Sequence, residues 1–267
     1  MAEFCEGVGR IGLLALLYLA VGIFPLLLIG VALQFVSGRF RVCCAKLFGT
    51  RLYVWLTAPG VMLHEFSHAL LCVVFHHEIT EFVLFSPQKN GNLGWVSHKW
   101  DKNSFWQNLG CFFIGIAPLF FGVAAIVFLT LLLLPTEFLT FPDLPESGLA
   151  AFKTQFRSTF ITLCRVWVET QILSDWKFWL WLYAVIAIGS QITLSRTDLS
   201  GTKSAAAALI GLLLLLAIAV ALLPIDGVCL PLIAIRCSAM LCGLLFYLLL
   251  LFGVLTLLLT VAAKEWS

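Results

Sequence analysis

The chain has 267 residues, of which 61% are hydrophobic and only 11% are charged, and its formal net charge at pH 7 is +2. Soluble domains carry about a quarter charged residues and roughly half apolar ones. The composition therefore excludes an ordinary soluble protein and predicts a multi-pass integral membrane protein in contact with the lipid bilayer. The small net charge says little about other partners, and we expect no nucleic acid among them.

Six apolar segments are long enough to cross the hydrocarbon core of a bilayer, which takes about 20 residues each. They are Ile11–Val36, Leu52–Phe75, Phe105–Leu134, Trp176–Leu194, Ser204–Leu223 and Ser238–Ala262. Lipid cannot satisfy backbone amides, and none of these segments alternates like a barrel strand, so we expect helices. The predicted fold class is all-α, with about six transmembrane helices in one domain over residues 1–267. Between the first two segments, "SGRFRVCCAKLFGTR" is expected to form a basic loop on the cytoplasmic side.

The segment "GVMLHEFSHALLC", residues 60–72, contains an HExxH motif within the second apolar segment. On a helix, residues four apart lie on the same face, so His64 and His68 can offer imidazole nitrogens to one metal ion. This arrangement suits Zn²⁺. Glu65 follows the first of the two histidines, where its carboxylate can serve as a general base rather than as a ligand.

The alternative for this motif is a chance spacing or a hydrogen-bonded cluster that only holds helices together. Ionisable side chains at membrane depth cost on the order of 3 kcal/mol each, so they are rare and usually functional. This cost favours the metal site. Gly60, Ser67 and Ala69 are small enough to let another helix approach closely. Pro59 is expected to bend or restart the helix one turn before the histidines, or else to be a detail of packing.

A β-hairpin is expected directly after the motif. Two strand-like segments, Ile79–Phe85 and Leu93–Trp100, flank Asn90-Gly91, which is a strong turn signal. The hairpin can hold an extended peptide at its edge, or it can be an interfacial loop anchored by tryptophans. Three nearby histidines are expected to be interfacial polar residues rather than ligands: His76, His77 and His98.

A catalytic zinc usually has three protein ligands, so two histidines are not sufficient. Two acids near the ends of later segments are candidates, Asp198 in "SRTDLSG" and Asp226 in "PIDG". Asp198 also suits a helix start, where it would favour the helix dipole. Asp226 with Gly227 also suits a turn between two spans.

Taken together, "HEFSH", "GWVSH", "GIAPLFFG" (residues 115–122) and an acid at a later helix start resemble the site-2 protease family of intramembrane zinc metalloproteases. The resemblance is to a divergent prokaryotic-type branch and covers a core of residues 52–201. It implies that His64 and His68 bind zinc and that Glu65 is the catalytic base. It also implies that an aspartate completes the site, and we favour Asp198 over Asp226.

The function implied is that of a zinc metalloendopeptidase which hydrolyses peptide bonds in a membrane-embedded protein segment. Two other classes stay open: a catalytically silent scaffold of the same fold, and a metal-ion transporter. Within the same chain, Phe152–Trp176 carries several charges among apolar residues and is expected to lie on the membrane surface as an amphipathic helix. The alternative for it is a short seventh span or the extension of a span.

Overall fold

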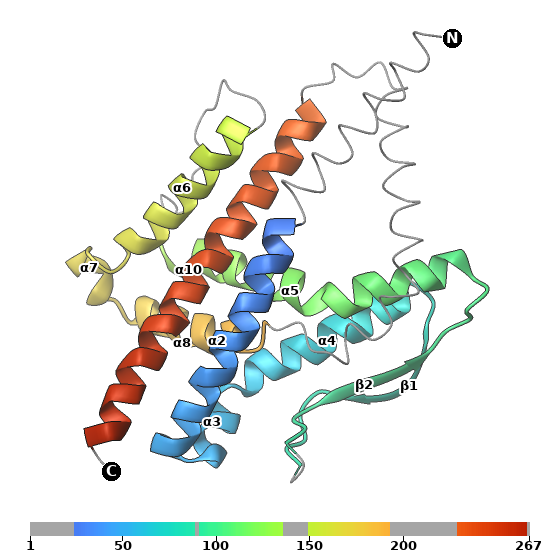
Figure 1. Ribbon diagram of the computed structural model, residues 1–267, viewed down its shortest axis with the longest axis horizontal. Coiled ribbons are helices and arrows are strands. Elements are labelled where there is room, and N and C mark those ends of the chain that lie inside the picture. Colours follow the sequence, from blue (N-terminus) through green and yellow to red (C-terminus); the bar gives the residue numbers. More distant parts are fainter. Residues whose placement is uncertain (1–23, 89–90, 136–148, 193–228, 266–267) are drawn as a thin grey trace.

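The computed structural model describes residues 24–88, 91–135, 149–192 and 229–265, and its described part is mostly helical, with one small two-stranded sheet (Figure 1). The helices are α2 (Phe24–Phe48), α3 (Thr50–Leu56), α4 (Ala58–Val74), α5 (Phe105–Leu133), α6 (Leu149–Arg165), α7 (Thr170–Leu173), α8 (Trp176–Gly189) and α10 (Cys229–Glu265). The strands are β1 (Glu78–Val83) and β2 (Trp95–Lys99).

Three of the described helices are long and apolar enough to cross a membrane: Leu28–Phe48 within α2, Phe105–Leu133, which is α5, and Ile235–Lys264 within α10. The expected third and last spans are therefore confirmed as candidate membrane helices. Helices α4 and α8 are apolar but shorter. Residues 11–23 of the first expected span and all of Ser204–Leu223 lie outside the described residues, so the number of six spans stays a prediction.

The expected basic loop is wrong. Arg39, Arg41 and Lys46 all lie within α2, which continues to Phe48, so the first helix extends well beyond the expected end at Val36. Helix formation satisfies the backbone amides of this segment, while its long basic side chains can extend their charged ends away from the helix. The turn to the next helix comes at Gly49, whose φ of 85° favours glycine.

The expected second span, Leu52–Phe75, is divided into the two helices α3 and α4. The break falls at Thr57, and Pro59 occupies the first turn of α4. Proline is tolerated there because an N–H in the first turn has no partner within the helix. The expectation that Pro59 restarts the helix before the motif is confirmed.

Helix α6 occupies the first part of the expected amphipathic segment and ends at Arg165, short of Trp176. It runs beside α10 (Figure 1). Four of its residues spaced four apart are buried, namely Ala151, Gln155, Thr159 and Leu163, and they form a stripe on one face. The position of α6 at a membrane surface stays a prediction.

The packing of α4, α5 and α8 determines where the site lies. Trp181 of α8 is fully buried, and its Nε1 donates to Thr130 Oγ1 of α5 at 2.9 Å. Gly60 of α4 packs directly against the backbone of Ala187 in α8. Ser67 and Ala69 are buried as well, so the expected close approach of another helix at the small residues of α4 is confirmed.

The expected β-hairpin is confirmed. Strands β1 and β2 are antiparallel, with Ile79 opposite His98 and Val83 opposite Trp95. Gly91 has a φ of 92° at the turn, a conformation that glycine adopts without strain. The hairpin lies along α4 (Figure 1), and Ile79 and Val96 pack on buried residues of α4 and α5.

Candidate metal centre and cavity

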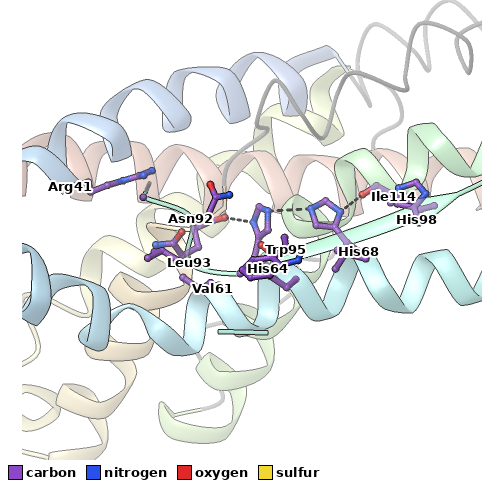
Figure 2. A pocket seen from close by; sticks show the side chains of 14 residues that line it. Arg41, Val61, His64, His68, Asn92, Leu93, Trp95, His98 and Ile114 are labelled. Carbon is purple, nitrogen blue, oxygen red and sulfur yellow. Dashed lines mark hydrogen bonds between the residues drawn. The ribbon is translucent and has the colours of Figure 1, made fainter. Parts of the chain in front are cut away.

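His64 and His68 lie one turn apart on α4 and turn their rings toward each other, as Figure 2 shows. Their Nε2 atoms are 3.2 Å apart, and their ring planes are inclined by 74°. His68 is buried and His64 is partly buried. The helical spacing in the sequence therefore brings the two imidazoles together as expected.

The other nitrogen of His68 is held by α5. His68 Nδ1 donates to the backbone carbonyl of Ile114 at 2.8 Å (Figure 2). In a regular helix this carbonyl would accept from the N–H of residue 118, but that residue is Pro118, which has none. The proline of the "APLFFG" segment thus leaves one carbonyl of α5 available to the histidine.

The corresponding nitrogen of His64 is held by the end of α8. His64 Nδ1 donates to the backbone carbonyl of Gln191 at 2.9 Å, and Gln191 lies two residues beyond Gly189, the last residue of α8, so its carbonyl is outside the hydrogen bonds of that helix. Gly60, one turn before His64, makes this possible. A Cβ at Gly60 would collide with the backbone of Ala187 and come within 2.9 Å of Gln191 Cγ.

These two bonds determine the protonation of the rings. A carbonyl oxygen can only accept, so each Nδ1 carries a hydrogen, and in the neutral rings each Nε2 is the acceptor. The two Nε2 atoms lie 3.2 Å apart, close enough for both to ligate a single cation. Two imidazoles on a tetrahedral zinc have their nitrogens roughly 3.3 Å apart, given Zn–N bonds of about 2.05 Å. The pair therefore fits two ligands of one zinc ion.

Glu65 opens onto the same space as the two histidines. It is partly buried and lines a cavity of about 460 Å³ together with His64 and His68. Gly94 of the hairpin lies against it: a Cβ there would be 2.8 Å from Glu65 Cγ and 2.7 Å from the carbonyl oxygen of Leu84. The glycine of the "GWVSH" segment thus leaves room for the Glu65 side chain.

The hairpin forms one wall of this cavity. Residues 91–96 and His98 line it, and Arg41 of α2 and Ile114 of α5 line other parts (Figure 2). The turn and β2 therefore contribute a nearly continuous run of residues to the cavity that contains the histidines. The cavity thus combines two imidazoles and a carboxylate with a wall of extended chain.

Both candidate third ligands lie outside the described residues. Asp198 follows Gln191 by seven residues, a segment that can extend on the order of 24 Å. Since the carbonyl of Gln191 contacts His64, the chain length permits Asp198 to return to the histidines. Asp226 lies much further along the chain.

A second group of possible metal ligands was missed. Cys72, His77 and His98 each offer one ligand atom, and these atoms lie within 4.8 Å of one another. His77 is buried, and its Nδ1 lies 2.9 Å from His98 Nδ1. Folding of the hairpin thus places His98 beside the end of α4, next to a buried His77, whereas His76 is exposed. The interpretation of the three histidines as interfacial polar residues rather than ligands stays a prediction.

The surroundings of this group favour neutral histidines. Burial lowers the pKa of His77 and of His98 below the ordinary value of 6.5, and the neighbouring His77 lowers that of His98 further. The sequence contained a signal for the group. The Asn90-Gly91 turn brings residues near 77 opposite residues near 100, and Cys72 lies one helical turn beyond His68.

No family model matches the chain, and neither a curated protein nor a solved structure does. The function therefore has to be inferred from the residues of this chain and their geometry.

Proposed function

We propose that the protein is an intramembrane zinc metallopeptidase that hydrolyses peptide bonds in membrane-embedded protein segments. The observation that supports this most directly is the geometry of His64 and His68. Their Nδ1 atoms are tied to backbone carbonyls and their Nε2 atoms lie 3.2 Å apart. The Glu65 side chain reaches the same cavity. This is the donor set of an HExxH peptidase, and it agrees with the site-2 protease resemblance of the sequence.

In this proposal His64, His68 and Asp198 hold the zinc ion. When bound there, zinc would supply Lewis acidity that activates a water molecule and polarises the scissile carbonyl. Glu65 would act as the general base that takes a proton from the attacking water, and would then deliver it to the leaving amine. The carbonyls of Ile114 and Gln191 keep both rings in the tautomer and orientation that ligation requires.

The cavity wall suggests how a substrate binds. A transmembrane helix hides its carbonyls in its own hydrogen bonds, so it must unwind before hydrolysis. Within the described residues the sheet has two strands only, so each strand has an outer edge. Trp95, Val96 and His98 of β2 line the cavity, so an unwound segment bound there could pair with the main chain of β2 as an added strand.

Two alternatives make different predictions. A silent scaffold would keep the fold without hydrolysis, whereas a transporter would carry metal ions through the chain. The presence of Glu65 beside the histidine pair favours the peptidase, because a carboxylate next to the first ligand has a direct role in hydrolysis.

The test is co-reconstitution of the full-length chain in liposomes with a single-span reporter that carries an epitope at each end and helix-breaking residues in its span. Three chains are compared: wild type, Glu65→Gln and Glu78→Gln. Glu78 is the matched control, since it is an exposed carboxylate at the start of β1. Cleavage is located by mass spectrometry of the fragments, zinc is measured in each purified chain, and zinc flux is followed across the same liposomes.

The proposal expects cleavage within the reporter span by wild type and Glu78→Gln, none by Glu65→Gln, and the same zinc content in all three. Loss of general base catalysis alone reduces the rate about 10² to 10⁴-fold. An intact reporter with wild-type protein that contains zinc would overturn the peptidase in favour of the scaffold. Zinc flux that is the same in Glu65→Gln and wild type, without cleavage, would overturn it in favour of transport.

A further inference from the structure

The end of α4 brings a thiol and an imidazole to the hairpin. Cys72 lies in the last turns of α4, four residues after His68, and its side chain is fully buried. The helix ends with His76 in the left-handed conformation, at a φ of 58°, and the N–H of His77 bonds to the carbonyl of Cys72 at 2.8 Å. This reversal turns the chain back over the helix end, which brings His77 close to Cys72.

The orientation of His77 leaves one nitrogen available for a ligand. Its Nε2 donates to the carbonyl of Gln107 at 2.8 Å, so in the neutral ring Nδ1 is the acceptor. Gly110 of α5 makes space for this ring, because a Cβ there would lie 2.9 Å from His77 Nε2. The acceptor Nδ1 points to His98 Nδ1 of β2 at 2.9 Å.

We propose that Cys72 Sγ, His77 Nδ1 and His98 bind a second divalent metal ion, which fastens β2 to the end of α4. The three ligand atoms already lie within 4.8 Å of one another, and a tetrahedral zinc holds nitrogen and sulfur ligands roughly 3.3 to 3.6 Å apart. Only small side-chain movements are therefore needed. One thiolate with two imidazoles suits Zn²⁺ rather than a hard cation such as Mg²⁺.

Metal binding at Cys72, His77 and His98 changes the protonation of the ligands as follows. Without metal, His98 Nδ1 donates its hydrogen to His77 Nδ1. Metal binding releases one proton from the Cys72 thiol to solvent. If His98 ligates through Nδ1, its hydrogen moves to Nε2 by exchange with solvent, so that the ring stays neutral.

The site has a structural role. His98 lines the cavity that contains His64 and His68, and β2 is the wall of that cavity. An ion that joins β2 to α4 fixes the distance between this wall and the histidine pair. The proposal concerns metal binding and hairpin anchoring, and it stands whether or not the chain hydrolyses peptides.

The test uses the purified full-length chain in detergent, stripped with a chelator and loaded with Co²⁺. A thiolate ligand gives Co²⁺ a near-ultraviolet charge-transfer band, which two imidazoles and a carboxylate do not give. We expect this band in wild type and in His64→Ala/His68→Ala, no band in Cys72→Ser, and at least about 10-fold weaker Co²⁺ binding in His98→Gln. The controls Cys242→Ser, another buried thiol, and His76→Asn, a neighbouring exposed histidine, should keep the band.

Absence of the band in wild type, its survival in Cys72→Ser, or its loss in Cys242→Ser would overturn the second site. If Cys72→Ser does not give a monodisperse helical protein, His98→Gln decides the question, because His98 is only partly buried. The double variant separates this site from the proposed zinc of the peptidase, since it removes the first pair of histidines and leaves Cys72, His77 and His98.

The anchoring role has its own readout. In the His64→Ala/His68→Ala chain, removal of metal should accelerate tryptic cleavage after Lys99, the exposed last residue of β2. Adding Cys72→Ser should make cleavage equally fast with and without metal. A cleavage rate that metal does not change in the double variant would overturn the anchoring role.

Discussion

Gly94 of the hairpin and Glu65 of α4 are in such close contact that a single methyl group would not fit between them. A Cβ on Gly94 would lie 2.8 Å from Glu65 Cγ. The position of the Glu65 side chain, the candidate general base, therefore depends on the absence of a side chain at residue 94 of the hairpin.

Gly94→Ala should impair hydrolysis more than it impairs zinc binding. The methyl group displaces Glu65 or the nearby carbonyls of Val83 and Leu84, and a misplacement of about 1 Å in a catalytic group can cost on the order of 10²-fold in rate. Cleavage of the reporter and zinc content measure the two effects. Gly38→Ala in α2 is the control, because a Cβ there meets nothing within 4 Å. Unchanged cleavage by Gly94→Ala would contradict the role of this contact.

Pro118→Ala should weaken zinc at the His64–His68 pair. The new N–H of residue 118 competes with His68 Nδ1 for the carbonyl of Ile114, and loss of such a supporting bond typically costs about 10 to 100-fold in metal affinity. Stability should not fall, since proline within a helix is unfavourable by about 3 kcal/mol. Competition with a chelator measures the affinity, in a Cys72→Ser chain so that a single site contributes.

Pro87→Ala is the control for this prediction. Pro87 is exposed and lies between the two strands of the hairpin, outside any helix, so its new N–H competes for no carbonyl of α5. If Pro118→Ala binds zinc as tightly as Pro87→Ala, the support of His68 by a freed carbonyl is wrong.

Gly60→Ala should destabilise the contact between α4 and α8. Its methyl group would collide with the backbone of Ala187, which cannot rotate away as a side chain can. Overpacking typically costs about 1 to 3 kcal/mol. Thermal unfolding in one detergent, followed by circular dichroism, measures the effect. Gly253→Ala in α10, where a Cβ would meet open space, should instead be neutral or stabilising by about 0.5 to 1 kcal/mol.

Asp198→Asn should release the zinc of the His64–His68 pair, whereas Asp226→Asn should retain it. An amide oxygen is a much weaker zinc ligand than a carboxylate, and Asp198 is only seven residues along the chain from Gln191, whose carbonyl contacts His64. Metal analysis of both variants in the Cys72→Ser chain distinguishes them. Zinc that remains in Asp198→Asn and is lost from Asp226→Asn would reverse the assignment of the third ligand.

The sequence alone determined four features of the protein: its apolar segments of membrane-spanning length, its mostly helical fold, the spacing of His64 and His68, and the hairpin. These features depend on local rules: hydrophobic length, a helical period of four residues, and the turn preference of Asn90-Gly91. The same rules indicated that Pro59 restarts a helix. They did not indicate that α2 continues to Phe48, because basic residues such as those after Val36 commonly follow the end of an apolar span.

Tertiary structure decided which groups surround the histidines. The bond from His64 to Gln191 joins residues 127 positions apart, and that from His68 to Ile114 joins residues 46 apart. Such partners depend on how α4, α5 and α8 pack, which Gly60 and Trp181 influence through contacts that no local pattern specifies. The grouping of Cys72 with His77 and His98 likewise required the reversal at His76 and the register of the two strands, because only folding converts distance along the chain into contact.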